Sequence, residues 1–241
     1  MVGIIIPKKV AIGIDFDGTA ANSLPELFTI MQKSWPKIRN EEYSISYEDF
    51  VAKIRPNITH AQNFYHLSAE FIDGRKCRPD EAKALEDKGI VEYRNARKEL
   101  MEDMDRYLEM IQPFDGIEDM FREMDYMNVD TFFTSNRERE TIRLFLDSIG
   151  CEKYVKGVFD IDGFSGRKSQ LEHIRSLGYD AKNCALYDDS PKNLDIALYL
   201  GMLAIGAPQG YVDNSLLDGY IQAYPKEVPG ILRNKLCIEV A

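Results

Sequence analysis

The sequence predicts an α/β protein with a doubly wound, Rossmann-like parallel sheet of about five strands and an inserted α-helical domain. Three observations predict this. A short apolar run, Val10–Ile14, ends abruptly in acidic residues, as a buried parallel strand does. After Pro113, apolar runs alternate with amphipathic segments. Between these parts the pattern is helical. We therefore expect a discontinuous core, residues 1–19 and 112–241, and a helical domain over 20–111.

The inserted domain has apolar residues at helical spacing and little that is typical of strands. Leu24 to Trp35 has such a period, with Pro25 tolerated in the first turn. Ser46 precedes a second helix start, and Asp80 to Ile111 is helical for a long way, with Gly89 as an expected break.

The second part of the core alternates between helices and strands, each helix ending near a glycine or at a strand start. Ser190 and Pro191 are typical of an N-cap and a first helical residue. The tail is expected to add an edge strand from Lys235 to Val240. The expected helices cover 115–124, 137–149, 168–177 and 191–200, and the expected strands cover 129–134, 157–161, 184–187 and 202–205.

Composition narrows the possible partners and location. The net charge of -10 argues against non-specific binding to nucleic acid or to an anionic membrane. No apolar run is long enough for a membrane span, and the N-terminal run is too short for a signal peptide. The 4 cysteines are scattered without metal-ligand spacing, which favours reduced thiols. We expect a cytoplasmic protein, and the net charge does not exclude a small anionic substrate.

Acidic residues follow two of the expected strands directly. Asp15 and Asp17 follow the first strand, and Asp188 and Asp189 follow the fourth. The carboxyl ends of the strands meet at one edge of a doubly wound sheet, where ligands bind. Two carboxylates about 4 Å apart repel by roughly 4 kcal/mol at an effective dielectric constant of 20. A counter-charge is therefore needed, and ligands that are all oxygen favour Mg²⁺.

Hydroxyl and cationic side chains are expected at the same edge. Thr134 ends the second strand, with Ser135 and Asn136 after it, and Lys168 begins the helix after the third strand. Together with a divalent cation, these groups suit a phosphoryl group. An aspartate can then attack phosphorus while a second carboxylate transfers protons. Ser135 and Asn136 are alternatively caps of the next helix.

These pieces resemble the sequence motifs of one enzyme superfamily. Asp15-Phe16-Asp17-Gly18-Thr19 is similar to the first motif of the haloacid dehalogenase-like hydrolases, and Thr134, Lys168 and Asp188-Asp189 are similar to the second, third and fourth. Phe114-Asp115-Gly116, together with an insertion directly after the first motif, resembles the phosphoglycolate phosphatase-like branch, in which the insertion is a helical cap.

The resemblance implies a role for each motif residue. Asp15 is implied as the nucleophile, Asp17 as the acid/base, and Thr134 with Lys168 as phosphoryl ligands. Mg²⁺ is implied at Asp15, the backbone carbonyl of Asp17 and the Asp188-Asp189 pair, with either member of the pair as the direct ligand. The expected activity is Mg²⁺-dependent hydrolysis of a small phosphomonoester through an aspartyl-phosphate.

Two alternatives remain open at this point. A phosphomutase uses the same aspartates but returns the phosphoryl group to a sugar phosphate. A non-catalytic binding protein on the same fold is the second alternative, because a fold does not guarantee an activity. The substrate is open among sugar phosphates, phosphoglycolate and nucleotides, and the oligomeric state is open too.

Overall fold

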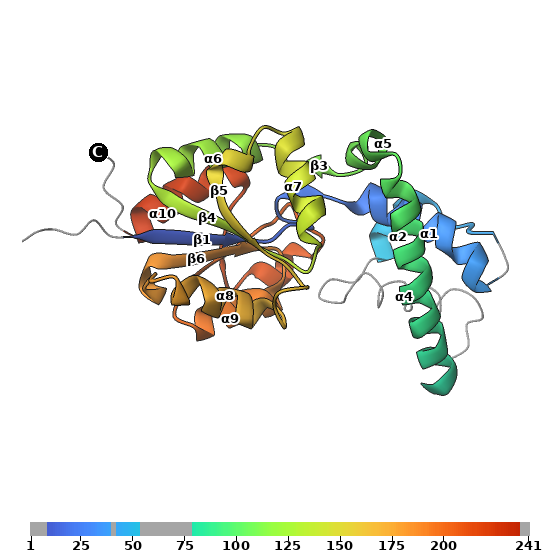
Figure 1. The fold of residues 1–241 in the computed structure, drawn as a ribbon. Helices are drawn as coiled ribbons and strands as arrows, with labels where there is room; N and C mark the ends of the chain where they lie inside the picture. The colour runs from blue at the N-terminus through green and yellow to red at the C-terminus, as the bar shows by residue number, and fades with distance from the viewer. Residues whose placement is uncertain (1–8, 40–41, 54–78, 237–241) are drawn as a thin grey trace, which may run out of the picture. The chain divides into compact units, whose positions relative to one another are not determined.

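The apolar run Val10–Ile14 forms β1, an inner strand of a six-stranded sheet. In the computed structural model, which describes residues 9–39, 42–53 and 79–236, the strand order is β5-β4-β1-β6-β7-β8 and every pair is parallel. Figure 1 shows the sheet with β1 between β4 and β6. The predicted doubly wound α/β fold is confirmed.

The strands and helices of the core follow the alternation expected from the sequence. In chain order they are β1 Val10–Ile14, β2 Ala21–Asn22, β3 Gln112–Pro113, α6 Ile117–Tyr126, β4 Val129–Thr134, α7 Arg139–Ser148, β5 Val155–Phe159, α8 Arg167–Ser176, β6 Cys184–Asp188, α9 Pro191–Tyr199, β7 Leu203–Gly206, β8 Ile221–Gln222 and α10 Val228–Lys235. Short 3₁₀ helices cover Glu152–Tyr154, Ala181–Asn183, Asn214–Leu217 and Pro225–Glu227. β2 and β3 form a separate two-stranded sheet.

The C-terminal part of the core differs from the expectation. β8 is a sixth strand, and its 2 residues are too few to show an alternating pattern. The expected edge strand from Lys235 to Val240 begins inside α10, a helix that ends at Lys235. Residues 237–240 of that expected strand lie outside the described residues. Proline at the start of α10 favours a helix there, because its fixed φ suits the first turn.

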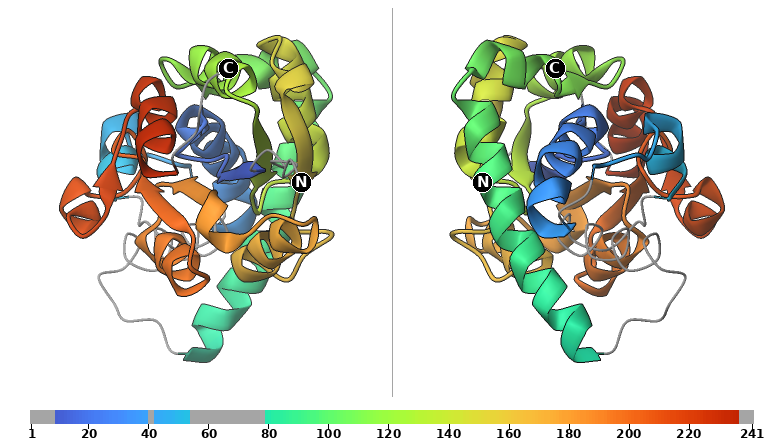
Figure 2. Two further views of the ribbon diagram at one scale, coloured as in Figure 1. Left: turned by 90° about the vertical axis from the view of Figure 1, so that its left-hand side faces the viewer. Right: turned by 90° about the vertical axis from the view of Figure 1, so that its right-hand side faces the viewer.

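Helices cover both faces of the sheet. Figure 1 shows α6 and α10 on one face and α8 and α9 on the other, and Figure 2 shows the layers along the strands. On the α8 and α9 face, Phe132 and Leu186 pack with buried Leu171 and Leu194. On the other face, Phe133 packs against Phe121 of α6 at 5.9 Å between ring centroids. Apolar side chains therefore pack on both faces of the sheet.

The chain divides into two compact units, Met1–Asn22 with Pro113–Ala241 and Ser23–Gln112. The second unit contains α1 Leu24–Arg39, α2 Tyr47–Lys53, α4 Pro79–Met101 and α5 Met104–Glu109. It is helical, as the sequence predicts. The expected break at Gly89 is wrong, because α4 continues through this residue. Gly89 is buried, and a single glycine inside a helix costs only about 1 kcal/mol relative to alanine, which a helix of 23 residues tolerates.

A buried charge pair organises the helical unit. Glu26 of α1 is fully buried and accepts hydrogen bonds from Arg97 Nε at 3.0 Å and from the Tyr107 hydroxyl at 2.8 Å. A buried carboxylate needs such partners, so these contacts fix α1 against α4 and α5. Among the residues that the structure describes, no helix is both long enough and apolar enough to span a membrane.

Candidate active site

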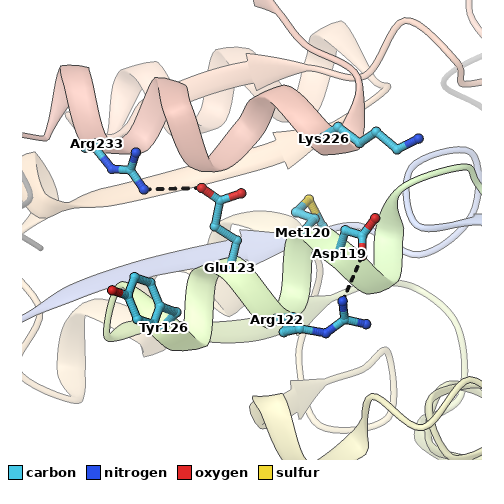
Figure 3. A pocket seen from close by; sticks show the side chains of 7 residues that line it. All are labelled: Asp119, Met120, Arg122, Glu123, Tyr126, Lys226 and Arg233. Atoms are coloured by element: carbon cyan, nitrogen blue, oxygen red, sulfur yellow. Dashed lines mark hydrogen bonds and ion pairs between the residues drawn. The ribbon is translucent and has the colours of Figure 1, made fainter.

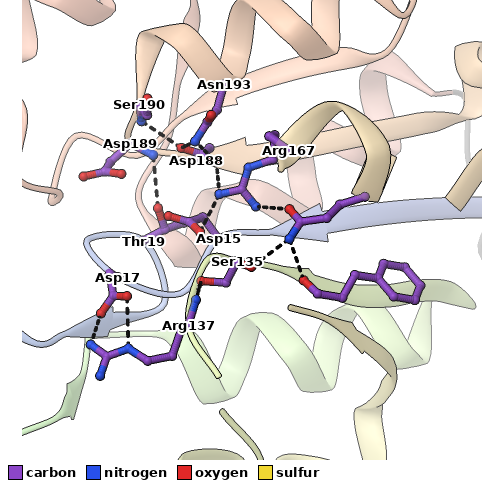
Figure 4. Close-up of polar contacts among 12 residues, drawn as sticks. Asp15, Asp17, Thr19, Ser135, Arg137, Arg167, Asp188, Asp189, Ser190 and Asn193 are labelled. Atoms are coloured by element: carbon purple, nitrogen blue, oxygen red, sulfur yellow. Dashed lines mark hydrogen bonds and ion pairs between the residues drawn. The ribbon is translucent and has the colours of Figure 1, made fainter. Parts of the chain in front are cut away.

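Three buried aspartates come together where β1 and β6 end. Ile14 of β1 pairs with Tyr187 of β6, and this register places the next residues, Asp15 and Asp188, side by side. Asp15, Asp188 and Asp189 each offer a carboxylate oxygen within 4.8 Å of the others (Figure 4). Strand ends from distant parts of the sequence therefore form one acidic cluster, at the edge where open α/β sheets bind ligands.

Arg167 lies within this acidic cluster. Its Nη2 donates to Asp15 Oδ1 at 2.6 Å and lies 3.0 Å from Asp188 Oδ2. Its Nη1 donates to Gln170 Oε1 at 3.2 Å, and the amide of Gln170 in turn donates to the carbonyl of Ser135 at 2.7 Å. The guanidinium is thus held by its own helix and by the end of β4, and it partly neutralises the acids.

Lys168, the cation expected from the sequence, is not brought into the cluster. Its ammonium lies 3.8 Å from Glu172 and 5.5 Å from the centre of the Tyr199 ring, and its side chain is 56% exposed. Helix α8 begins at Arg167, one residue before the expected start. Successive helical residues point about 100° apart, so the inward position belongs to Arg167. In the sequence, the only indication that Arg167 could take this position is that it directly precedes Lys168.

Asp17 lies apart from the acidic cluster and contacts a different arginine. Arg137 donates through Nε to Asp17 Oδ2 at 3.1 Å, and its Nη2 contacts Asp17 Oδ1. Figure 4 shows Asp17 in contact with Arg137, with no contact drawn between Asp17 and Asp15, Asp188 or Asp189. The group of described acids whose oxygens gather at one point does not include Asp17. Nothing in the sequence analysis indicated Arg137.

The two acids that follow β6 have different surroundings. Asp188 Oδ1 accepts from the backbone N–H of Ser190 at 2.8 Å and from the Asn193 amide at 3.1 Å. Asp189 Oδ2 accepts from the backbone N–H of Tyr211 at 2.9 Å, and its own N–H donates to Thr19 Oγ1 at 3.0 Å. Asp188 also contacts Arg167, whereas Asp189 is held by Thr19 and by Tyr211 of the loop after β7.

Burial raises the pKa values of all three clustered acids. It raises the pKa of Asp15, although the neighbouring guanidinium of Arg167 opposes the shift. It raises the pKa of Asp188 to about 7, again against Arg167. The pKa of Asp189 is raised well above its ordinary value by burial and then by the charges of Asp188 and Asp15. One guanidinium does not compensate three desolvated carboxylates.

The expected phosphate ligands after β4 have three different environments. Thr134 is fully buried, and its hydroxyl has no hydrogen-bond partner among the described residues. Ser135 is buried too, and its hydroxyl accepts from the N–H of Arg137 at 3.2 Å. Asn136 is exposed. Neither Ser135 nor Asn136 caps α7, whose N-cap is Glu138.

Two glycines make room for Asp189. A Cβ atom on Gly18, which has a φ of +81°, would lie 2.3 Å from Asp189 Oδ2. A Cβ atom on Gly210 would lie 2.2 Å from Asp189 Cβ and 2.6 Å from the carbonyl oxygen of Gly18. Because both residues are glycines, the turn after β1 and the loop after β7 can each approach Asp189 closely.

The structure also contains an open cavity of about 640 Å³ away from the acidic cluster, beside α6 and α10. Figure 3 shows two pairs among its charged side chains. Arg122 Nη1 lies 3.0 Å from Asp119 Oδ1, and Arg233 Nη2 lies 3.2 Å from Glu123 Oε1. None of the site residues expected from the sequence lines this cavity. The acidic cluster is therefore the stronger candidate site.

The fold and the site define a doubly wound α/β protein with an acidic centre at the carboxyl edge of its sheet. The family model of the haloacid dehalogenase-like hydrolases matches residues 12–207, and the chain belongs to this family. The family resemblance inferred from the sequence is confirmed. No curated protein sequence matches this chain significantly.

Several solved structures share the fold at low sequence identity. A protein from Haemophilus somnus 129pt, described as a predicted phosphoglycolate phosphatase, is 14% identical with a TM-score of 0.68, covering 95% of this chain and 99% of that one. A predicted phosphatase from Clostridium acetobutylicum is 14% identical with a TM-score of 0.71, covering 94% and 99%. A Thermotoga maritima protein provisionally described as a beta-phosphoglucomutase is 12% identical with a TM-score of 0.62, covering 93% and 99%.

The close packing of Gly210 against Asp189 leads to the first prediction. We expect Gly210→Ala to destabilise the protein by about 1–3 kcal/mol, because the added methyl group must displace Asp189 or the Gly18 turn. Thermal unfolding monitored by circular dichroism measures the loss. Gly219→Ala is the matched control, since a Cβ there meets nothing within 4 Å. Equal melting temperatures for the two variants would contradict the packing argument.

The raised pKa of Asp189 leads to the second prediction. An acid whose pKa rises on folding stabilises the folded state at pH values below its unfolded pKa of about 3.9, and this contribution is lost as the pH rises through the folded value. In metal-free buffer, Asp189→Asn should therefore melt above the wild type at pH 8. We expect about 3 °C or more, on a scale where 1 kcal/mol corresponds to roughly 2–4 °C.

The pH dependence separates this effect from an improvement in packing. The advantage of Asp189→Asn should shrink as the pH falls from 8 towards 4.5, because the wild-type carboxyl then becomes neutral. Melting temperatures of both proteins at several pH values, with EDTA present, measure the difference. A variant that melts below the wild type at every pH would show that the Asp189 charge does not destabilise the metal-free protein.

Proposed function

We propose that this protein hydrolyses a small phosphomonoester with Asp15 as the nucleophile and Mg²⁺ as the cofactor. The observation that carries the proposal is the buried cluster of Asp15, Asp188 and Asp189 around Arg167. The family is one of hydrolases, and the neighbours from Haemophilus somnus and Clostridium acetobutylicum are described as predicted phosphatases. The substrate class and the mechanism are our proposals.

The charges of the cluster fit a divalent cation. Three ionised carboxylates beside one guanidinium leave a net charge of about -2 in a buried pocket, and this arrangement is costly without a counter-ion. All the candidate ligand atoms are oxygens, which favours Mg²⁺ over softer metals. We propose Asp15, Asp188 and Asp189 as its side-chain ligands. Because the side chain of Asp17 contacts Arg137, Asp17 is proposed as a ligand through its backbone carbonyl only.

Two buried polar atoms favour a phosphoryl group next to Asp15. Thr134 Oγ1 and Arg167 Nε have no hydrogen-bond partner among the described residues. Buried donors without partners are costly, and an anionic ligand with several oxygens would satisfy them. We therefore propose Thr134 and Arg167 as phosphoryl ligands, with Arg167 in the role that the sequence assigned to Lys168.

In the proposed reaction, a carboxylate oxygen of Asp15 attacks phosphorus and the bond to the leaving oxygen breaks. Asp17, which enters the cycle protonated, gives its proton to that oxygen, so the alcohol leaves neutral. Water then attacks the aspartyl-phosphate, its proton passes to Asp17, and Asp15 is regenerated with release of phosphate. When bound, Mg²⁺ neutralises charge on the phosphoryl oxygens. Arg167 holds Asp15 in place throughout.

The substrate is proposed to be a small phosphorylated metabolite, and the helical unit is proposed as the cap that determines selectivity. Cys151 and Cys184 are buried free thiols, which favours a reducing compartment such as the cytoplasm. Sugar phosphates, phosphoglycolate and nucleotides are all candidate substrates.

The third prediction tests the nucleophile. Purified protein should hydrolyse 4-nitrophenyl phosphate with Mg²⁺, and EDTA should abolish the activity. Asp15→Asn should lower kcat by at least about 10³-fold, because the amide is a poor nucleophile. A colorimetric assay measures both. A wild type as inert as Asp15→Asn would favour a non-catalytic binding protein. Release of isomerised sugar phosphate in place of free phosphate would favour a phosphomutase.

The fourth prediction compares the two neighbouring cations. Arg167→Gln should lower kcat with 4-nitrophenyl phosphate by about 10²-fold or more, because it removes donors to both Asp15 and the phosphoryl group. Lys168→Gln should keep nearly wild-type kcat, because this side chain lies in solvent beside Glu172. Melting temperatures serve as the folding control. A large loss in the Lys168 variant alone would restore Lys168 as the phosphoryl ligand.

A further inference from the structure

We propose that Arg137 is a positioning residue that orients the carboxylate of Asp17 for proton transfer, an inference that rests on the proposed function. Arg137 approaches Asp17 side-on, with Nε 3.1 Å from Oδ2 and Nη2 against Oδ1. Both carboxylate oxygens are therefore engaged by one guanidinium, as Figure 4 shows. A two-point contact fixes the plane of the carboxylate as well as its location.

The Arg137–Asp17 pair is largely buried, which distinguishes it from an ion pair on the protein surface. The Arg137 side chain is 0% exposed, and that of Asp17 is 18% exposed. An exposed ion pair is weak and is readily exchanged for water, whereas a buried guanidinium depends on its anionic partner. The buried Arg137 therefore restricts the movement of the Asp17 side chain. The part of Asp17 that stays exposed leaves access for a substrate.

The surroundings of Arg137 restrict its own movement. The centre of its guanidinium lies 5.4 Å from the centre of the Phe16 ring, and its backbone N–H donates to Ser135 Oγ. Phe16 packs edge-on against Phe133 and Phe145, at 6.0 and 5.0 Å between ring centroids. Arg137 is thus held by Ser135 and by Phe16, the residue between Asp15 and Asp17, and Phe16 is in turn packed against β4 and α7. Lysine, a flexible point charge, would not reproduce this side-on contact.

A chemical consequence separates positioning from simple stabilisation. Proton donation by Asp17 matters more when the leaving oxygen is more basic. A misoriented Asp17 should therefore slow phenyl phosphate more than 4-nitrophenyl phosphate, whose leaving group needs little protonation. A general loss of folded enzyme would lower both rates equally.

The experiment measures kcat and KM for both aryl phosphates in the wild type, Arg137→Lys and Arg137→Met. We expect kcat for phenyl phosphate to fall about 10²-fold, and by at least about tenfold more than kcat for 4-nitrophenyl phosphate, with KM nearly unchanged. Arg139→Met is the matched control: it removes an arginine two residues on, whose partner is Asp160 and whose side chain is 46% exposed. It should leave the ratio of the two rates at the wild-type value.

A double-mutant comparison tests whether the two residues act together. Asp17→Asn should show the same preference for the better leaving group, and adding Arg137→Met to it should cause little further loss. Equal losses on both substrates, or losses that multiply in the double variant, would overturn the positioning role.

A spectroscopic measurement covers the case in which Arg137 variants do not fold. The ¹⁵N-resolved Nε–H signal of Arg137 should exchange slowly with solvent in the wild type, and it should shift and exchange faster in Asp17→Asn. An unchanged signal would overturn the contact itself. If the wild type hydrolyses neither phosphate, the proposed function fails and this role fails with it. If the wild type is active and the rate ratio does not change, only the role of Arg137 fails.

Discussion

The structure around the site depends on the contact of Arg167 with Asp15 and Asp188. Two strands deliver carboxylates to the same buried place, and at such separations like charges repel strongly. A single guanidinium between them lowers this repulsion, because both acids gain an opposite charge and Asp15 also gains a hydrogen bond. Gln170 continues the contact to the backbone at the end of β4, so the position of Arg167 is tied to the sheet itself.

The two acids of the first motif have different surroundings, because each contacts a different arginine. Asp15 and Asp17 are two residues apart, yet Asp15 contacts Arg167 and Asp17 contacts Arg137. The turn at Gly18, with its positive φ, follows them directly. In the proposed reaction one carboxylate is the nucleophile and the other the proton donor, and these two roles need different environments. Here two cations, from α8 and from the loop after β4, provide that difference.

The same cluster opposes folding stability. Burial raises the pKa values of Asp15, Asp188 and Asp189, which means that ionising them costs free energy in the metal-free protein. Gly18 and Gly210 belong to the same arrangement, because their lack of a side chain lets the backbone lie close to Asp189. Such a conflict between stability and local charge is typical of functional sites.

The sequence by itself determined the fold class, the helical insertion and the strand ends at which Asp15 and Asp188 lie. These follow from local patterns and from the rule that parallel strands present their carboxyl ends at one edge. Only the tertiary structure decided that Arg167 and not Lys168 enters the cluster, that Arg137 holds Asp17, and that α4 continues through Gly89. The physical reason is the phase of a helix: adjacent residues point about 100° apart, and packing against the sheet selects which of them turns inward.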